Sequence, residues 1–326
     1  MEKLTKGILI GSGIAAVSTA AMIGATQLTS DYLVRLALDR GGVPAVEKRM
    51  QKLSGSPLTP EVKAQLQYNA SKLESRCQQT RLKTSDGLTM VGHWRPCKEP
   101  RRVIVAMHGW RSNWARDFGT IADFWHDNGC SVLYPEQRGQ GSSEGEYIGF
   151  GMLERHDCRA WIDWVNRKTG GDLPIYLAGI SMGATTVLMT AGMELPSNVH
   201  GVIADCGFTS PDAIWHHVAK HNLHLNYGFY ASAANDGCRR RLSMGSKDYS
   251  TLDAMAECEI PVLFIHGTDD KFVPVEMTYE NYKACKARKH LLVIPGANHG
   301  MSYRVDKAAY ENAVLNFWHL YDKKHA

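Results

Sequence analysis

Residues 174–193 read PIYLAGISMGATTVLMTAGM. The apolar run at the start predicts a buried strand, and the small apolar residues after Ser181 predict a helix. At the junction, Gly179 and Gly183 flank Ser181 in the pattern G-x-S-x-G, which places a serine on a tight strand-to-helix turn. Side chains at the two glycines would collide with the neighbouring strand and helix. The stretch therefore predicts an exposed nucleophilic serine, with the N–H of Met182 at the helix N-terminus placed to stabilise an oxyanion.

Strand-like and helix-like segments alternate on both sides of this stretch, from Cys77 to the C-terminus. The apolar runs that predict further strands are RVIVAMHG, CSVLYPE, VHGVIADC, PVLFIHG and HLLVIPG. Asp86 and Gly87 predict a hairpin turn between two more strands. Strands followed by helices in this order predict an α/β fold, with a mostly parallel central sheet and helices on both of its faces.

Residues 207–255 interrupt the alternation, since they contain no clear strand and many aromatic, His and small residues. They stand between two predicted core strands, and ligands bind beyond the carboxyl ends of the strands in sheets of this kind. We therefore predict a cap over the active site at about residues 207–255, inserted into a catalytic domain of residues 77–326. Residues 31–76 carry apolar residues at helical spacing and predict a helical connector on the domain surface.

The N-terminus carries a hydrophobic segment within residues 1–30. No charged residue stands between Gly7 and Ser30, and the stretch is long enough to cross a bilayer as a helix. We expect a single N-terminal membrane anchor, so that residues 7–30 associate the protein with a membrane. A cleaved signal peptide, giving a secreted protein, and a helix packed on a cytoplasmic domain are the alternatives.

The composition argues against several other classes of function. The net charge is +4, from 37 basic and 33 acidic residues, so nucleic acid is not an expected partner. The eight cysteines include no C-x-x-C pair, which disfavours a metal ribbon or a dense disulfide framework and favours free buried thiols. No H-E-x-x-H pattern accompanies the cap histidines, which are His216, His217, His221 and His224. We therefore expect neither a metal nor a cofactor.

A long amphipathic segment, LERHDCRAWIDWVNRKTG, predicts a helix before the strand that leads to Ser181. Glu154, His156 and Asp157 stand in its first turns. We expect these three side chains on a solvated or helix-stabilising face.

A serine hydroxyl becomes a good nucleophile only when a base takes its proton. HLLVIPGANHG supplies His299 after the last predicted strand, and the chain order of serine, acid and histidine is the one expected for this type of sheet. Asp269 and Asp270 follow the preceding strand, and Asp205 ends the strand before that one. Spacing alone does not choose among these three carboxylates. The acid must orient the His299 ring and stabilise its imidazolium form.

A second oxyanion donor is expected from the loop AMHGWRSN, which follows an earlier strand. His108 and Gly109 turn this loop back toward Ser181, so the backbone N–H of Trp110 is the expected partner of the Met182 N–H. The indole ring of Trp110 is then expected to line the substrate pocket.

Seven short motifs over residues 80–320 match one family pattern; they are TSDGLTMVGHW, MHGWRSN, PEQRGQGSSEG, GISMG, DCGFTSP, IHGTDDKFVP and PGANHG. Through them the chain resembles α/β-hydrolases of the serine-aminopeptidase and monoacylglycerol-lipase-like group, and is similar to bacterial members with an N-terminal hydrophobic segment. The resemblance implies the α/β-hydrolase fold. In the family pattern H-G-x-x-D-x-x-V-P the aspartate is the catalytic acid, and that position is Asp270 here. Glu136 replaces the aspartate of the family loop D-x-R-G-x-G-x-S. We interpret this loop as structural.

These observations predict a serine hydrolase that cleaves carboxylic esters through Ser181, His299 and Asp270 and an acyl-enzyme intermediate. The expected substrate is a small-molecule ester. The alternative is a serine peptidase that acts on short peptides or on an N-terminal residue. Such a peptidase needs a carboxylate to bind the substrate amine, for which Asp212 or Asp236 of the cap are candidates.

Overall fold

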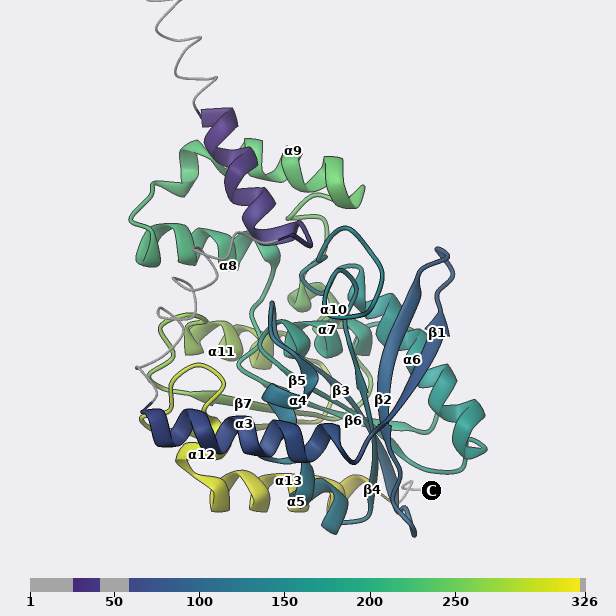
Figure 1. Cartoon of the computed structure of the whole chain (residues 1–326). Coiled ribbons are helices and arrows are strands. Elements are labelled where there is room, and N and C mark those ends of the chain that lie inside the picture. Colours follow the sequence, from purple (N-terminus) through teal and green to yellow (C-terminus); the bar gives the residue numbers. More distant parts are fainter. Residues whose placement is uncertain (1–25, 42–58, 323–326) are drawn as a thin grey trace, which may run out of the picture.

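The computed structural model describes residues 26–41 and 59–322, and an eight-stranded sheet runs through their centre (Figure 1). The strands are β1 (Gln78–Lys83), β2 (Thr89–Arg95), β3 (Arg102–Met107), β4 (Cys130–Pro135), β5 (Ile175–Ile180), β6 (Val199–Asp205), β7 (Val262–Gly267) and β8 (Lys289–Ile294). Their order in the sheet is β1-β2-β4-β3-β5-β6-β7-β8, and all neighbours from β4 to β8 are parallel. The β1–β2 hairpin pairs antiparallel with β4, and its turn at Asp86 and Gly87 confirms the sequence prediction.

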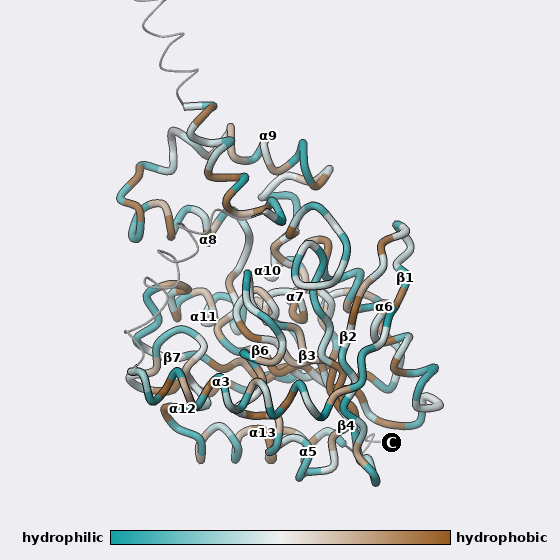
Figure 2. Tube along the Cα trace, viewed as in Figure 1, coloured by the Kyte–Doolittle hydropathy of each residue, from teal (hydrophilic) through white to brown (hydrophobic). Residues whose placement is uncertain are grey.

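Helices cover both faces of the sheet, as the alternation in the sequence predicts (Figure 1). One face packs against α6 (Glu154–Thr169), α7 (Met182–Ala191), α10 (Thr251–Glu257) and the end of α11 (Val275–Ala284). The other face packs against α3 (Pro60–Glu74), α4 (Trp114–Phe118), α5 (Ala122–Asp127), α12 (Ser302–Val305) and α13 (Lys307–Tyr321). Because both faces are covered, β3 and β4 are buried along their whole length and consist mostly of apolar residues. The hydropathy colours of Figure 2 show hydrophobic residues gathered where the strands of the sheet lie.

We expected Glu154, His156 and Asp157 on a solvated or helix-stabilising face of α6; His156 is exposed, but Glu154 and Asp157 are buried. The Glu154 carboxylate accepts hydrogen bonds from the N–H groups of Gly149 (2.6 Å) and Gly151 (2.8 Å). The Asp157 carboxylate accepts two hydrogen bonds from the Arg138 guanidinium, at 2.7 and 2.6 Å. A solvated face was the wrong expectation for these two residues, because both carboxylates have partners in the loops before α6 and the periodicity of one helix does not show such partners.

The loop after β4, in which Glu136 replaces the family aspartate, is structural as we interpreted it. The Glu136 carboxylate lies 2.7 Å from the His93 ring on β2 and accepts the N–H of Ser142. The Ser143 hydroxyl donates to the Glu136 carbonyl oxygen (2.6 Å). A Cβ on Gly141 would overlap the Glu136 carboxylate, so this position requires glycine. The loop thus ties β4 to β2.

A lid covers the end of the sheet where the strands finish, and its helices come from two distant parts of the chain (Figure 1). From the predicted cap come α8 (Pro211–His217), η1 (Val218–Asn222), η2 (Tyr227–Phe229) and α9 (Ala231–Leu242). A helix over residues 26–38 lies beside α9 and buries Val34 and Leu38 in the same apolar cluster. The last helix of the predicted cap region, α10, packs instead against α7 at the face of the sheet.

The helix over residues 26–38 crosses the boundary that we set at residue 30 between the hydrophobic segment and the connector. Residues 1–25 and 42–58, which make up most of both predicted segments, lie outside the described residues. In the part of the chain that the structure describes, no helix is both long and apolar enough to cross a membrane. Helix α3, at the end of the connector range, packs on the sheet through Ala70 and Leu73.

The cysteines have free thiols, as the sequence predicts. Six of the eight are buried, and Cys77 and Cys97 are half-buried. They contribute to the apolar packing as small side chains.

Candidate active site

Ser181 stands on the sharp turn between β5 and α7. Its backbone has φ 57° and ψ −120°, a strained conformation for a residue with a side chain. A Cβ on Gly179 would overlap the backbone of Gly183, and one on Gly183 would overlap the carbonyl oxygen of Met107 on β3. The Ser181 N–H donates to the carbonyl oxygen of Asp205 at the end of β6 (2.9 Å). Close backbone approach therefore requires both glycines of the sequence pattern.

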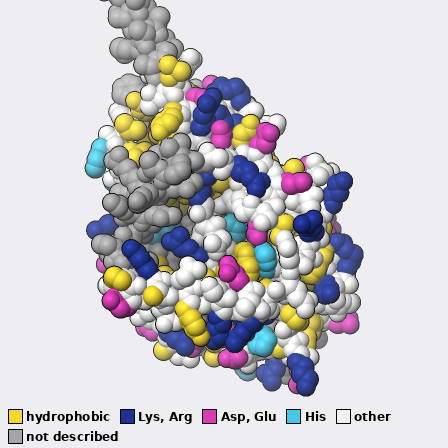
Figure 3. All heavy atoms as spheres, in the orientation of Figure 1, with side chains coloured by type: hydrophobic (Ala, Val, Ile, Leu, Met, Phe, Trp, Pro, Cys, Tyr) yellow, Lys and Arg dark blue, Asp and Glu magenta, His cyan; other side chains and the backbone are white. Residues whose placement is uncertain are grey.

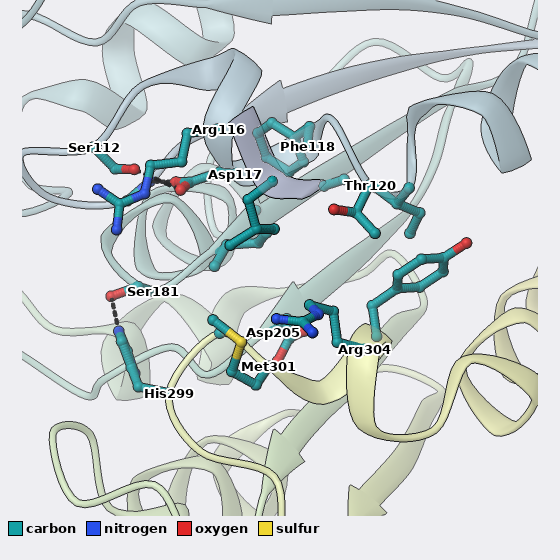
Figure 4. A pocket seen from close by; sticks show the side chains of 18 of the residues that line it. Ser112, Arg116, Asp117, Phe118, Thr120, Ser181, Asp205, His299, Met301 and Arg304 are labelled. Atoms are coloured by element: carbon teal, nitrogen blue, oxygen red, sulfur yellow. Dashed lines mark hydrogen bonds between the residues drawn. The ribbon is translucent and has the colours of Figure 1, made fainter. Parts of the chain in front are cut away.

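Two hydrogen bonds connect Ser181, His299 and Asp270, and Figure 4 shows the first of them. His299 Nε2 lies 2.9 Å from Ser181 Oγ, and His299 Nδ1 lies 2.7 Å from Asp270 Oδ2. With the proton of the neutral ring on Nδ1, this nitrogen donates to the carboxylate and Nε2 accepts from the serine hydroxyl. The three residues lie in the loops after β5, β7 and β8. The structure thus brings together three residues that the sequence analysis predicted to act together.

The Asp270 carboxylate is buried and held on both of its oxygens. Oδ1 accepts hydrogen bonds from the N–H groups of Phe272 and Val273, each at 2.9 Å. Burial alone would raise the pKa of this carboxyl, but the adjacent His299 and His266 outweigh burial and hold the pKa far below its usual range. Asp270 is therefore a carboxylate throughout the physiological pH range.

His266 supports Asp270 from the side opposite His299, a role that the sequence analysis did not predict. Its Nε2 lies 2.9 Å from the Val273 carbonyl oxygen and 3.2 Å from Asp270 Oδ2, and its Nδ1 lies 2.6 Å from Thr278 Oγ1. A proton on Nε2 satisfies all three contacts. The position of His266 four residues before Asp270 was the sequence signal for this contact.

Neither of the two other candidate acids forms a hydrogen bond with His299 among the residues described. Asp269 is exposed, and its carboxylate accepts the hydroxyl of the adjacent Thr268 (2.9 Å). Asp205 is buried and accepts the hydroxyl of Ser302 (2.9 Å). Burial raises the pKa of the Asp205 carboxyl to about 6. The geometry therefore separates Asp270 from both of its neighbours.

The electrostatics of the site favour a charged His299. Burial alone would lower the pKa of this imidazole, but the negative charge of Asp270 outweighs burial and raises the pKa well above its ordinary value. A ring stabilised in this way as imidazolium is suited to accept the proton of Ser181. The thiol of Cys206 lies close to His299, and burial raises the pKa of this thiol to about 11, so it stays neutral.

The loop between β3 and α4 approaches Ser181 from the other side. The Asp117 carboxylate accepts the Gly109 N–H (2.7 Å), which anchors the start of the loop. Trp110 follows, and its ring lies at the mouth of the site. Within residues 26–41 and 59–322, the backbone N–H groups of Trp110 and Met182 have no hydrogen-bond acceptor. Two backbone N–H groups that lack an acceptor and lie beside a serine can donate hydrogen bonds to an oxyanion.

Two cavities meet at Ser181. The larger, of about 420 Å³, lies under the lid, and its walls are mainly aromatic and aliphatic. The smaller, of about 280 Å³, contains His299 and extends toward α4 and α12, where Figure 4 shows Arg116 and Arg304. Both cavities share the side chains of Trp110 and Phe272. Ser181 is therefore reached from an apolar side and from a more polar side.

The one group of side chains with metal-ligand spacing among the described residues is Cys206, Asp270 and His299, whose ligand atoms lie within 4.8 Å of one another. Both nitrogens of His299 are already engaged, one with Asp270 and one with Ser181. A metal would have to break one of these hydrogen bonds.

In the lid, the ring of His217 stacks on His221 and its Nε2 lies 3.3 Å from the Lys271 carbonyl oxygen.

Comparison with solved structures identifies a similar fold. An esterase of Pyrococcus furiosus, Pf2001, superposes with a TM-score of 0.63 over 82% of this chain and 96% of its own, at 20% sequence identity. An identity this low reports on the fold alone. The match confirms the predicted fold class, including the mostly parallel sheet with helices on both faces.

Comparison with known sequences finds a match to one family model and several similar proteins. The family described as serine aminopeptidase, S33, matches residues 98–230, which include Trp110 and Ser181. The uncharacterized protein YqkD of Bacillus subtilis (strain 168) is 28% identical over 69% of this chain and 73% of its own. A bifunctional esterase/perhydrolase, DCH, of Acinetobacter calcoaceticus is 24% identical over 67% of this chain and 92% of its own.

Proposed function

We propose that this chain, an α/β hydrolase, is a serine hydrolase that cleaves carboxylic esters, with Ser181 as nucleophile, His299 as base and Asp270 as the acid that orients the base. The observation that carries the proposal is the hydrogen-bonded chain from Ser181 through His299 to Asp270 at a strained strand-to-helix turn. Strain of this kind persists where function requires it.

The first half of the reaction forms an acyl-enzyme. Ser181 Oγ attacks the ester carbonyl carbon while His299 Nε2 takes the hydroxyl proton, and Asp270 stabilises the resulting imidazolium. The negative charge on the carbonyl oxygen is stabilised by the N–H groups of Trp110 and Met182. The tetrahedral intermediate then collapses, the bond to the alcohol oxygen breaks, and His299 returns its proton to that oxygen.

The second half repeats these steps with water. His299 takes a proton from a water molecule, whose oxygen attacks the acyl carbon bound to Ser181. The same two amides stabilise the second tetrahedral intermediate. Its collapse releases the carboxylic acid, and the proton on His299 returns to Ser181 Oγ.

The charges around the site favour an ester over a peptide with a free N-terminus. An aminopeptidase needs a free carboxylate for the substrate ammonium group. The two aspartates that line the smaller cavity, Asp117 and Asp205, are both already hydrogen-bonded. Three arginines line the same cavity and repel an ammonium group; they are Arg111, Arg116 and Arg304.

The cap acids that we considered for an aminopeptidase also lie outside the cavities. Asp212 accepts the Tyr227 hydroxyl (2.9 Å), and Asp236 is exposed. Neither lines the cavities that contain Ser181. The peptidase therefore remains the second candidate, supported by the name of the matching family.

A substrate panel with an active-site label tests the proposal. We expect p-nitrophenyl esters to be hydrolysed with kcat/KM at least about a hundredfold above that of aminoacyl p-nitroanilides. A fluorophosphonate should add one group to the protein, on Ser181, as peptide mass mapping measures. Preference for the anilides would favour the peptidase, and labelling at another serine would contradict the assignment of the nucleophile.

A further inference from the structure

We propose that residues 26–41 form a wall of the acyl-binding cavity, and that this N-terminal segment selects esters of aliphatic acids. The inference rests on the proposed ester hydrolysis and adds to it the substrate class and the element that determines it. Four observations support it: the position of the general acid, the walls of the larger cavity, the contacts that fix the segment, and its link to the oxyanion site.

The position of His299 decides which cavity takes which half of the ester. His299 must deliver a proton to the leaving alcohol oxygen, so the alcohol lies in the cavity that contains this ring. That is the smaller cavity, with its arginines. The larger cavity reaches Ser181 and Trp110 but is not lined by His299. The acyl group therefore extends into the larger cavity under the lid.

The walls of the larger cavity fit an aliphatic chain. Apart from Ser181, the lining side chains are mainly hydrocarbon or aromatic, including Phe150, Trp215, Leu225 and Phe272. No Asp, Glu, Lys, Arg or His of the described residues lines it. Its volume of about 420 Å³ lies within the usual range for small-molecule sites. A carboxylate or ammonium on the acyl group would be desolvated there without a partner.

Residues of the N-terminal helix supply one side of this cavity. The lining residues from this helix are Ser30, Tyr32, Leu33, Val34, Leu36 and Ala37. Leu33 and Ala37 are one helical turn apart, so they lie on the same face of the helix. Across the cavity stand residues of α8 and η1, including Ile214 and Val218. Two of the cavity walls thus come from segments about 180 residues apart in the chain.

Ion pairs and packing fix the helix to α9. The Arg241 guanidinium, whose side chain is 11% exposed, forms ion pairs with Asp31 (3.1 Å) and Asp39 (2.7 Å). Between these two contacts, Val34 packs against Gly237, where an added Cβ would lie 3.2 Å from the valine side chain. The helix therefore has a defined position in the lid.

Backbone contacts fix the end of the segment to the catalytic domain. Arg40 donates to the carbonyl oxygens of Gly141 (2.6 Å) and Ser143 (2.5 Å) in the loop after β4. Arg111 donates to the carbonyl oxygens of Leu36 (3.1 Å) and Asp39 (2.6 Å). Arg111 thus ties the segment to the loop that carries Trp110, and Arg40 ties it to the loop after β4.

Trp110 links the segment directly to the proposed chemistry. Its indole Nε1–H donates to the Ala37 carbonyl oxygen (2.9 Å), while its backbone N–H is a proposed oxyanion donor. The same ring lines both cavities. An acyl chain that fits against Leu33 and Ala37 is therefore positioned relative to the residue that stabilises the transition state.

A pair of matched substitutions on the helix tests the proposal. Leu33→Trp places a large ring in the acyl cavity, whereas Leu28→Trp makes the same change at a side chain that is 76% exposed and does not line the cavity. Figure 3 shows exposed hydrophobic side chains at the end of the molecule where the lid helices lie. We expect Leu33→Trp to lower the ratio of kcat/KM for p-nitrophenyl decanoate to that for the acetate by about tenfold or more. Leu28→Trp should leave the ratio within twofold of the wild-type value.

A second measurement does not need turnover. Fluorophosphonates with ethyl and decyl chains are reacted with each variant, and the labelling rate of Ser181 is followed by intact mass. The wild-type protein should prefer the decyl reagent, and Leu33→Trp should reduce that preference by about tenfold. Equal ratios for the wild-type, Leu28→Trp and Leu33→Trp proteins would overturn the inference. Selective labelling without any ester turnover would support the acyl cavity and count against the proposed hydrolysis alone.

Discussion

Asp269 and Asp270 are adjacent in the sequence, but of the two only Asp270 forms a hydrogen bond with His299. The backbone turn after β7 directs the Asp270 side chain inward, where the N–H groups of Phe272 and Val273 fix it, and leaves Asp269 in solvent. The spacing of residues could not make this choice, because it shows how far along the chain a carboxylate stands and not the direction in which it points. The family pattern supplied the choice, and the geometry agrees with it.

Substitution of the two aspartates separates their roles. Asp270→Asn keeps the shape of the side chain but favours the wrong tautomer of His299, so we expect kcat to fall by about ten-thousandfold. Asp269→Asn should keep kcat within about threefold of the wild-type value, because its carboxylate is exposed. The measurement is hydrolysis of a short p-nitrophenyl ester by both variants. A larger loss in Asp269→Asn would contradict the assignment.

The pH dependence of the reaction reports on His299. The ring acts as a base only when it is neutral, and Asp270 raises its pKa above the ordinary value of 6.5. We therefore expect kcat/KM to rise with pH through a midpoint above 6.5. Asp270→Asn removes the negative charge that stabilises the imidazolium, so the midpoint of its residual activity should move to lower pH. A midpoint that is unchanged or higher in Asp270→Asn would show that Asp270 does not act on this ring.

At the scale of the secondary-structure elements, the sequence predicted the strands better than it predicted the partners of the helices. The core strands are continuous apolar runs because they are buried on both faces, and such runs are easy to recognise. Helix α6 is different, since its amphipathic pattern did not show that Asp157 is buried against Arg138. Likewise, Val34 and Leu38 have helical spacing, but their partners on α9 lie about 200 residues away.

The pair of Arg138 and Asp157 makes a stability prediction at this scale. Removing one partner of a buried ion pair leaves the other charge without compensation, so Arg138→Gln should lower the free energy of unfolding by about 3–5 kcal/mol. The control is Arg239→Gln, which breaks the exposed pair of Arg239 with Asp248 and should cost no more than about 1 kcal/mol. Urea titration followed by tryptophan fluorescence measures both changes. Equal losses in the two variants would contradict a structural role for the buried pair.

At the scale of the whole molecule, the N-terminal segment of residues 26–41 contacts both the lid and the catalytic domain. We divided residues 1–76 into a hydrophobic segment and a surface connector, whereas the helix over residues 26–38 crosses that boundary and lines a cavity. Hydrophobicity and length suggested an anchor for residues 7–30, but they could not indicate that part of this stretch packs on α9. The contact depends on side chains such as Arg241, which no local pattern connects to Asp31.

Two truncations separate attachment from catalysis. We propose from the sequence that residues 7–30 associate the protein with a membrane, mainly through residues 7–25, so the full chain should sediment with membranes. Deletion of residues 1–25 should give a protein in the supernatant with near-normal ester hydrolysis, since it keeps the cavity wall. Deletion of residues 1–41 should reduce hydrolysis of long-chain esters by about tenfold or more, because it removes that wall. Full-length protein in the supernatant would contradict membrane association, and normal long-chain activity without residues 26–41 would contradict their role.

The most direct test of the central claim is the activity of Ser181→Ala on a short p-nitrophenyl ester. The matched control is Ser142→Ala, which removes the hydroxyl of an exposed serine in the loop after β4. Loss of the nucleophile of a triad typically reduces kcat by about a millionfold. We therefore predict that Ser181→Ala loses all measurable turnover and keeps the wild-type circular dichroism spectrum, while Ser142→Ala retains activity. Turnover by folded Ser181→Ala within tenfold of the wild-type rate would contradict the account.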